Sequence, residues 1–263
     1  MLDTAQNIFL VVVWMTLSMT FLVLLNYFWA PARRRVHNDV IGWQISILGT
    51  IYAVMIGFML YAVWSNFQIA ETNANNEANA LVNLFRTADG LPSPQRDTIE
   101  IAAANYANAV LTDEWPTMSR DGVPHAGQPF IMQLWTTMTR TPAANLNQQA
   151  SLQQAMHELS NVTEHRRIRI LESQTKMPTI LWTVLVVGGM ITIGSCCLIG
   201  SENVALHFCL IFSLSLLISL SLIAIEDIDG TFQGGVHVSP YAFVRAQRTM
   251  INPGISPDSP PKE

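Results

Sequence analysis

Four long stretches of the chain contain no Asp, Glu, Lys or Arg. They hold 29, 31, 25 and 23 residues, and a charged residue bounds each of them on both sides. A helix needs about 20 apolar residues, at about 1.5 Å per residue, to cross the hydrocarbon core of a bilayer. The pattern therefore predicts four membrane-spanning helices, at about residues 7–30, 40–67, 178–200 and 204–225.

Aromatic residues mark several ends of these stretches. Trp29 ends the first, Trp43 and Trp64 bound the second, and Trp182 begins the third. An indole has an apolar body and a polar N–H, so it favours the membrane–water interface. We expect the first stretch to remain as a span and not to be cleaved as a leader, because no basic residue precedes it and Arg33–Arg35 follow it.

The charged residues that the spans lack are concentrated in residues 71–176, which predicts a soluble helical insert between the second and third spans. Nothing from Ser65 to Ala88 interrupts a helix, so the second span is expected to continue into the insert. Pro116 is expected to end a helix that begins near residue 93. The predicted organisation is a transmembrane hairpin at 1–70, the insert at 71–176, a second hairpin at 177–225 and a C-terminal segment at 226–263 whose last residues form a disordered tail.

Composition indicates a membrane protein and excludes other classes. Half of the residues are hydrophobic and 13% are charged, against about 25% charged in ordinary soluble domains. A net charge of −5 gives no basic surface for nucleic acid. Three cysteines provide neither a disulfide framework nor the spacing of a zinc site.

Four spans place both termini and the insert on one side of the membrane. Arg33–Arg35 lie in a short connection, which favours the cytoplasm for that connection and the outside for the insert.

The motifs of nucleotide-binding and hydrolytic enzymes are missing, so we predict neither an enzyme nor a cofactor. One helical face carries potential metal ligands, but a solvated face explains them better; its residues are His157, Asn161, Glu164 and His165. No metal is predicted. The weak candidates for a cation site are Glu226, Asp227 and Asp229, which follow the fourth span. In an oligomer they would form a carboxylate ring, although such charges more often end a helix in water.

His207, one turn into the fourth span, is better explained as a hydrogen-bonded structural residue than as a functional group in the membrane. Gly188 and Gly189 are better explained by helix packing than by phosphate binding.

The second span carries a continuous stripe of small or weakly polar residues at helical spacing. Its members are Gly42, Ser46, Thr50, Ala53, Gly57, Tyr61 and Ser65, with Gly49 beside Thr50. Small residues allow close packing of helices in a membrane. They can also line a pore, where they leave room and hydroxyls help to solvate an ion. Periodicity alone favours packing.

An ordered series of short motifs resembles a bacterial bestrophin-like membrane family. The series includes Leu48-Gly49-Thr50-Ile51-Tyr52-Ala53-Val54, Glu77-Ala78-Asn79-Ala80-Leu81, Tyr106-Ala107, Glu114-Trp115-Pro116, Arg166-Arg167-Ile168-Arg169, Leu181-Trp182, and Phe232 with Val238-Ser239-Pro240. It covers about residues 39–245, and it departs from the family at Thr231, where proline is expected.

This resemblance implies a four-span helical protein that is distantly similar to bestrophins, which are oligomeric anion channels with a pore-lining second helix and a helical domain on the cytosolic side. The implied side of the insert is opposite to the one that the arginines favour. The resemblance also makes a pore-lining role of the stripe as well supported as a packing role.

We therefore expect a homo-oligomeric, multi-pass ion channel of a bacterial inner membrane, in contact with lipid and small ions but not nucleic acid. Its anion conduction is implied by the resemblance, while the acidic residues beyond the fourth span leave cations open. The expected pore-lining residues are Ser46, Thr50, Ala53, Gly57 and Tyr61. The alternative is a non-conducting membrane scaffold or sensor whose insert binds a partner protein.

Overall fold

The computed structural model describes residues 4–252 and contains helices but no strand within that range. The chain forms two compact units. Unit 1 contains Met1–Ser65 and Lys176–Gly230, and unit 2 contains Asn66–Thr175 and Thr231–Glu263. The predicted disordered tail, from Ile255 onward, lies outside the described residues.

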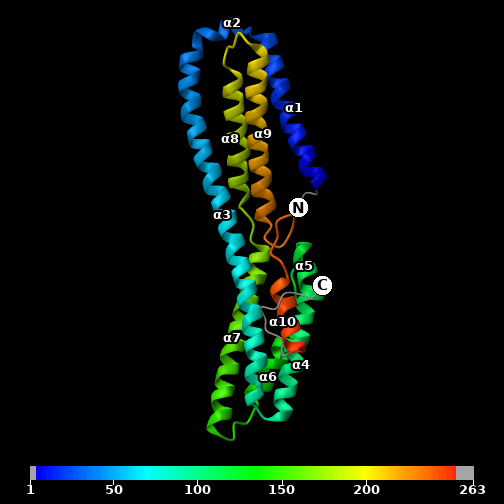
Figure 1. The fold of residues 1–263 in the computed structure, drawn as a ribbon. Helices are drawn as coiled ribbons and strands as arrows, with labels where there is room; N and C mark the ends of the chain where they lie inside the picture. Colours follow the sequence, from blue (N-terminus) through cyan, green and yellow to red (C-terminus); the bar gives the residue numbers. More distant parts are fainter. Residues whose placement is uncertain (1–3, 253–263) are drawn as a thin grey trace. The chain divides into compact units, whose positions relative to one another are not determined.

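Unit 1 holds the membrane-spanning helices. These are α1 (Thr4–Phe28), the first part of α3 (Asn38–Thr87), α8 (Thr179–Cys197) and α9 (Val204–Asp229) (Figure 1). Of the helices in the described part of the chain, these four are long and apolar enough to cross a membrane. The prediction of an all-α membrane protein with four spans is confirmed.

Tyr52 fixes the contact between α3 and α8. It is 4% exposed, and its hydroxyl donates a hydrogen bond to the carbonyl of Leu185 at 3.0 Å. Its ring lies against Gly188 and Gly189, where an added Cβ would stand 3.0 and 2.8 Å from atoms of Tyr52. The packing role predicted for these two glycines is confirmed, because only glycine leaves room for the tyrosine.

The two short connections of unit 1 are joined by polar contacts. One of them contains α2 (Pro31–Arg34) and the 3₁₀ turn η1 (Arg35–His37); the other joins α8 to α9. The buried guanidinium of Arg34 donates to the carbonyl of Cys197 at 2.6 Å. Asn38 and Gly200 exchange two hydrogen bonds of 2.9 Å between side chain and backbone. Each connection therefore supports the other.

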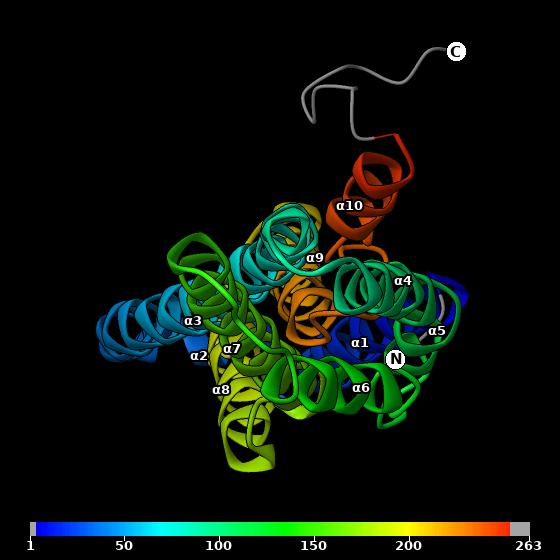
Figure 2. The same cartoon turned by 90° about the horizontal axis from the view of Figure 1, so that it is seen from below.

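Unit 2 is a bundle that surrounds its own apolar and charged interior. Its elements after α3 are η2 (Ala88–Gly90), α4 (Ser93–Ala109), the π-turn η3 (Val110–Glu114), α5 (Trp115–Ser119), α6 (Gln128–Thr139), α7 (Leu146–Gln174) and α10 (Tyr241–Ile251). Helix α6 contacts both α4 and α7, and Figure 2 shows α10 beside α4. Fully buried residues such as Leu84, Ile99, Leu134 and Leu159 form the apolar part of this interior.

The predicted continuation of the second span into the insert is confirmed, because α3 runs unbroken from Asn38 to Thr87. The expectation that Pro116 ends a helix is wrong. Pro116 instead lies in the first turn of α5, directly after the π-turn in which the Trp115 N–H bonds the carbonyl of Val110. Proline is tolerated at this position because the first N–H groups of a helix have no partner within it. Helix α10 is an element that the sequence analysis did not predict.

We expect Gly189→Ala to lower the melting temperature of the purified protein, because its Cβ would stand 2.8 Å from the Tyr52 hydroxyl. Overpacking of this kind costs about 1–3 kcal/mol. The matched control is Gly194→Ala on the same helix, since a Cβ at Gly194 meets nothing within 4 Å. Equal melting temperatures for the two variants would contradict the role assigned to Tyr52.

Candidate functional site: the exposed face of α3

The five residues predicted to line a pore share one exposed face of α3. Ser46, Thr50, Ala53, Gly57 and Tyr61 are all exposed in the protomer. The hydroxyls of Ser46 and Thr50 donate to the carbonyls of Gly42 and Ser46, one turn earlier, at 3.0 and 2.7 Å. These bonds satisfy the hydroxyl protons and leave oxygen lone pairs on the surface of the helix.

The glycines of this stripe have no neighbours on other helices. A Cβ built on Gly42, Gly49 or Gly57 meets nothing within 4 Å among the described residues. Gly188 and Gly189 on α8 show the opposite, since each lies against a tyrosine. Packing within the protomer therefore does not explain the small residues of α3.

Other faces of α3 have different surroundings. Tyr52 and Val63 are buried against the other helices of unit 1. A further face carries large exposed apolar residues: Trp43, Ile47, Ile51, Val54 and Phe58. At 3.6 residues per turn the stripe lies between these two faces, so it is a separate surface of small side chains.

The carboxylates after the fourth span do not form a metal cluster with the described residues, since no three His, Cys, Asp or Glu side chains there could hold an ion. Asp229 accepts the Met177 N–H at 3.0 and 3.2 Å, which joins the end of α9 to the segment before α8. Glu226 and Asp227 each have interactions of their own. A cation-attracting role of these residues stays a prediction.

The two histidine predictions have different outcomes. The structural role predicted for His207 is confirmed, because it is 6% exposed and its Nε2 lies 3.2 Å from the Cys196 carbonyl oxygen. His165 is not part of a solvated face, because its Nδ1 contacts Asn73 Oδ1 at 2.7 Å and its carbonyl accepts from Asn73 Nδ2 at 2.8 Å. These contacts join α7 to α3.

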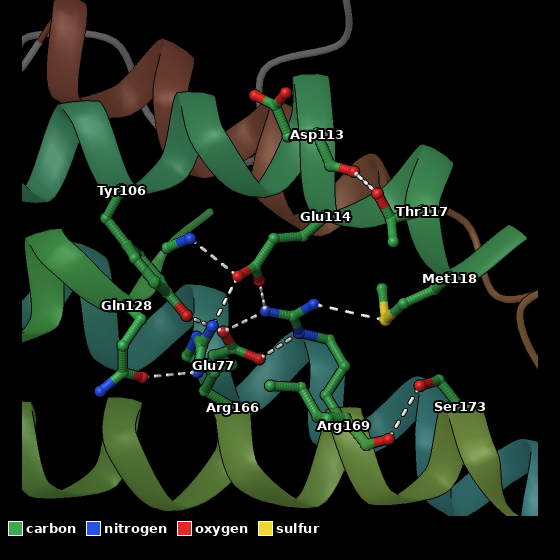
Figure 3. A network of polar contacts seen from close by, with 12 residues as sticks. Glu77, Tyr106, Asp113, Glu114, Thr117, Met118, Gln128, Arg166, Arg169 and Ser173 are labelled. Atoms are coloured by element: carbon green, nitrogen blue, oxygen red, sulfur yellow. Dashed lines mark hydrogen bonds and ion pairs between the residues drawn. The ribbon is translucent and has the colours of Figure 1, made fainter. Parts of the chain in front are cut away.

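Unit 2 contains a buried network of charged side chains that the sequence analysis did not predict (Figure 3). Arg169 on α7 donates to both oxygens of Glu77 on α3, at 2.7 and 3.0 Å, and to Glu114 Oε2 at 2.8 Å. Arg166 donates to Glu114 Oε1 at 2.6 Å, and Tyr106 donates to Glu77. Two guanidiniums and two carboxylates thus neutralise one another inside the bundle.

Aromatic rings cover one side of this network. The Arg169 guanidinium carbon lies 5.7 Å from the centre of the Trp115 ring and 5.6 Å from that of Phe243 on α10. The Trp115 indole also donates to the Val238 carbonyl at 3.3 Å. Cation–π contacts are strongest where the cation is desolvated, so Arg169 couples α10 to the rest of unit 2.

The network keeps Glu114 ionised. Burial alone would raise the pKa of Glu114, but the guanidiniums of Arg169 and Arg166 hold it below its ordinary value. Arg166 also donates to Gln128 at 3.1 Å, and Glu114 accepts the Gly127 N–H at 2.8 Å. Because every carboxylate oxygen of Glu77 and Glu114 has a partner, the arrangement is structural and offers no free acid or base for catalysis.

Comparison with known proteins decides the family. A model of the Bestrophin-like domain matches residues 10–243. The chain belongs to the Bestrophin-like family. The protein is accordingly an integral membrane protein, and the resemblance identified from its motifs is confirmed.

Solved structures share the Bestrophin-like fold with this chain. Two are single-residue variants of a bacterial bestrophin homologue from Klebsiella pneumoniae, 14% and 12% identical, with TM-scores of 0.63 and 0.62. Each match covers 94% of this chain, and 99% and 98% of the respective homologue. At this identity the likeness shows the fold alone. No curated protein matches the chain significantly.

The motifs that carried the family resemblance contain the charged residues of the network. Glu77, Tyr106, Glu114, Arg166 and Arg169 all lie in those segments. A signal was therefore available, but the pairing was not, because positions 77 and 169 are 92 residues apart. No local spacing rule connects such positions.

We expect Arg169→Leu to destabilise the protein by about 3–5 kcal/mol, because it leaves the carboxylates of Glu77 and Glu114 buried without their main partner. Unfolding of the purified protein in detergent measures this. The control is Arg167→Leu on the same helix, which changes an exposed side chain and should stay within about 0.5 kcal/mol. A similar loss in both variants would argue against the network.

Glu172 on α7 gives a pH dependence of opposite sign to that of Glu114. Burial raises the pKa of Glu172 from 4.5 to about 7, and its Oε2 has no hydrogen-bond partner among the described residues. A carboxyl with a raised folded-state pKa binds its proton more tightly in the folded state, so its contribution to stability falls as pH rises from 4.5 to 7.

Glu172→Gln should therefore raise the free energy of unfolding at about pH 8 by roughly 1–2 kcal/mol, allowing for partial solvent exposure. The gain should disappear below the unfolded-state pKa of 4.5. Melting temperatures of both proteins across this pH range measure the difference. A pH-independent gap between them would contradict the assigned ionisation.

Proposed function

We propose that this protein is a homo-oligomeric ion channel of a bacterial inner membrane in which α3 of each protomer contributes to the lining of a pore. The proposed lining residues are Ser46, Thr50, Ala53, Gly57 and Tyr61. We base anion conduction on the family alone, since we identify no residue of this chain that would select the ion. No catalytic role is proposed.

The observation that supports the pore is the unpartnered stripe of α3. A Cβ added to any of its glycines would meet no atom of another described segment within 4 Å, and its hydroxyl oxygens lie on the exposed helix surface. An isolated span would more favourably present large apolar side chains to lipid, as the neighbouring face of α3 does with Ile51 and Phe58. A surface of small and hydroxyl-bearing residues fits a water-filled path when copies of α3 surround it.

The direct measurement is single-channel recording of the purified protein in a planar bilayer with asymmetric salt. Discrete currents with a defined reversal potential would support a channel and give the sign of the permeant ion. Silence across voltage, calcium and pH would favour a non-conducting scaffold or sensor whose insert binds a partner.

Enlarging the stripe should block conduction without preventing assembly. We expect Ala53→Leu and Gly57→Leu to reduce unitary conductance at least about tenfold, because a leucine side chain occupies space that a narrow pore needs for the ion and its water. The control is Ala62→Leu, which makes the same change as Ala53→Leu at an exposed α3 position outside the stripe. It should conduct like the parent protein.

The size of the assembly, measured in detergent, distinguishes a pore from a helix interface. Wild-type conductance in Ala53→Leu and Gly57→Leu would refute the pore lining. Loss of the oligomer in these two variants, with Ala62→Leu intact, would show instead that the stripe packs copies of the chain together.

A further inference from the structure

Unit 2 contains a polar groove that neither the buried charge network nor the stripe uses. It encloses about 310 Å³ between α3 and α10. Binding sites for small molecules begin at about 300 Å³, so the space suits a ligand of a few heavy atoms with its bound water. The wall from α3 consists of Asn79, Val82, Asn83 and Arg86, and the wall from α10 of Ala242, Arg245, Ala246 and Thr249.

The charge of the groove is one-sided. Arg86 and Arg245 both line it, and no Asp or Glu does, although the whole chain has a net charge of −5. Neither arginine forms an ion pair within the described part of the chain. Elsewhere in unit 2 the buried arginines Arg166 and Arg169 each form an ion pair with a buried carboxylate, so Arg86 and Arg245 differ in having no anionic partner.

The polar side chains of the groove carry N–H donors that make few hydrogen bonds within the protein. The Arg245 guanidinium has one hydrogen bond to a described residue, from Nη2 to Asn79 Oδ1 at 3.5 Å, which is longer than the usual range of about 2.7–3.2 Å and therefore weak. The Arg86 side chain has no hydrogen bond to a described residue and is exposed. The amides of Asn79 and Asn83 add further N–H groups on the same wall.

Small residues leave the groove open. Ala242, Ala246 and Thr249 are buried beneath Arg245 on α10, and the Thr249 hydroxyl donates to the Arg245 carbonyl at 3.0 Å. That bond holds the threonine side chain against its own helix. Arg245 itself is half-buried and lines the open space of the groove.

We propose that this groove binds a small molecule through an oxyanion, a phosphate or carboxylate group, held between Arg86 and Arg245. A guanidinium presents parallel N–H groups that match the two oxygens of a carboxylate or phosphate, and charge-assisted bonds of this type are about twice as strong as neutral ones. The amides of Asn79 and Asn83 bond the remaining oxygens, and the alanines accept a short apolar body. The proposal is independent of ion conduction.

Thermal unfolding of the purified full-length protein in detergent tests the site. The probes are inorganic phosphate, citrate and a soluble short-chain phosphatidic acid, each titrated at constant pH and ionic strength against sodium chloride. A ligand of the folded state raises the melting temperature in a saturable way. Response to phosphate or citrate identifies a free anion as the ligand, and response to the phosphatidic acid alone identifies a lipid headgroup.

Variants assign the response to the groove. Arg86→Gln and Arg245→Gln should each weaken the apparent affinity about tenfold, as expected for loss of one charge-assisted contact, and the double variant should not respond. Arg248→Gln is the control, because Arg248 is exposed on α10 but does not line the groove. Arg86 is exposed, so its variant tests the site even if Arg245→Gln fails to fold.

Two results would overturn the proposal. One is a melting temperature that shows no saturable rise with any of the three probes beyond the value in sodium chloride at the same ionic strength. The other is an equal saturable response in the parent protein and in Arg86→Gln.

Discussion

Helix α3 runs for 50 residues without a break, and this continuity constrains much of the structure. Within each unit, helical geometry sets the angular position of every side chain along α3. Buried residues recur at helical spacing from Tyr52 through Val63, Ala70 and Ala74 to Leu81. Only this one face of α3 is buried, so the small-residue stripe and the large apolar face remain exposed over several turns.

The same helix also brings a carboxylate into unit 2. Glu77 lies on the buried side of α3 and is 0% exposed, so it requires charged partners in the interior. Arg169 provides two hydrogen bonds to it and a third to Glu114, and the aromatic rings of Trp115 and Phe243 cover the guanidinium. Arginine suits this position because its planar group can serve two carboxylates at once. The packing of unit 2 thus depends on the buried charge of Glu77 and on its pairing with Arg169.

Features that depend on neighbouring residues could be predicted from the sequence, and those that depend on distant partners could not. The spans follow from the absence of charge, and the unbroken α3 follows from the lack of glycine or proline between Ser65 and Ala88. Pro116 was misread, because its effect depends on the π-turn before it. For the stripe, periodicity could not tell packing from a pore, and the empty surroundings of Gly57 exclude only packing within the protomer. Helix α10 did carry a local signal that the sequence analysis missed, because its buried residues recur at helical spacing directly after Ser239-Pro240: Ala242, Phe243, Ala246, Thr249 and Met250.

The π-turn η3 has a consequence for the phase of the helix that contains it. Neighbouring residues of an α-helix point about 100° apart, yet Glu114 and Trp115 both serve Arg169, one by an ion pair and the other through its ring. The wider turn at Val110–Glu114 contains one more residue per turn than α-helical geometry would allow. This additional residue rotates the faces of α5 by about 100° relative to an uninterrupted α-helix, and in this register the indole of Trp115 lies at the Arg169 guanidinium.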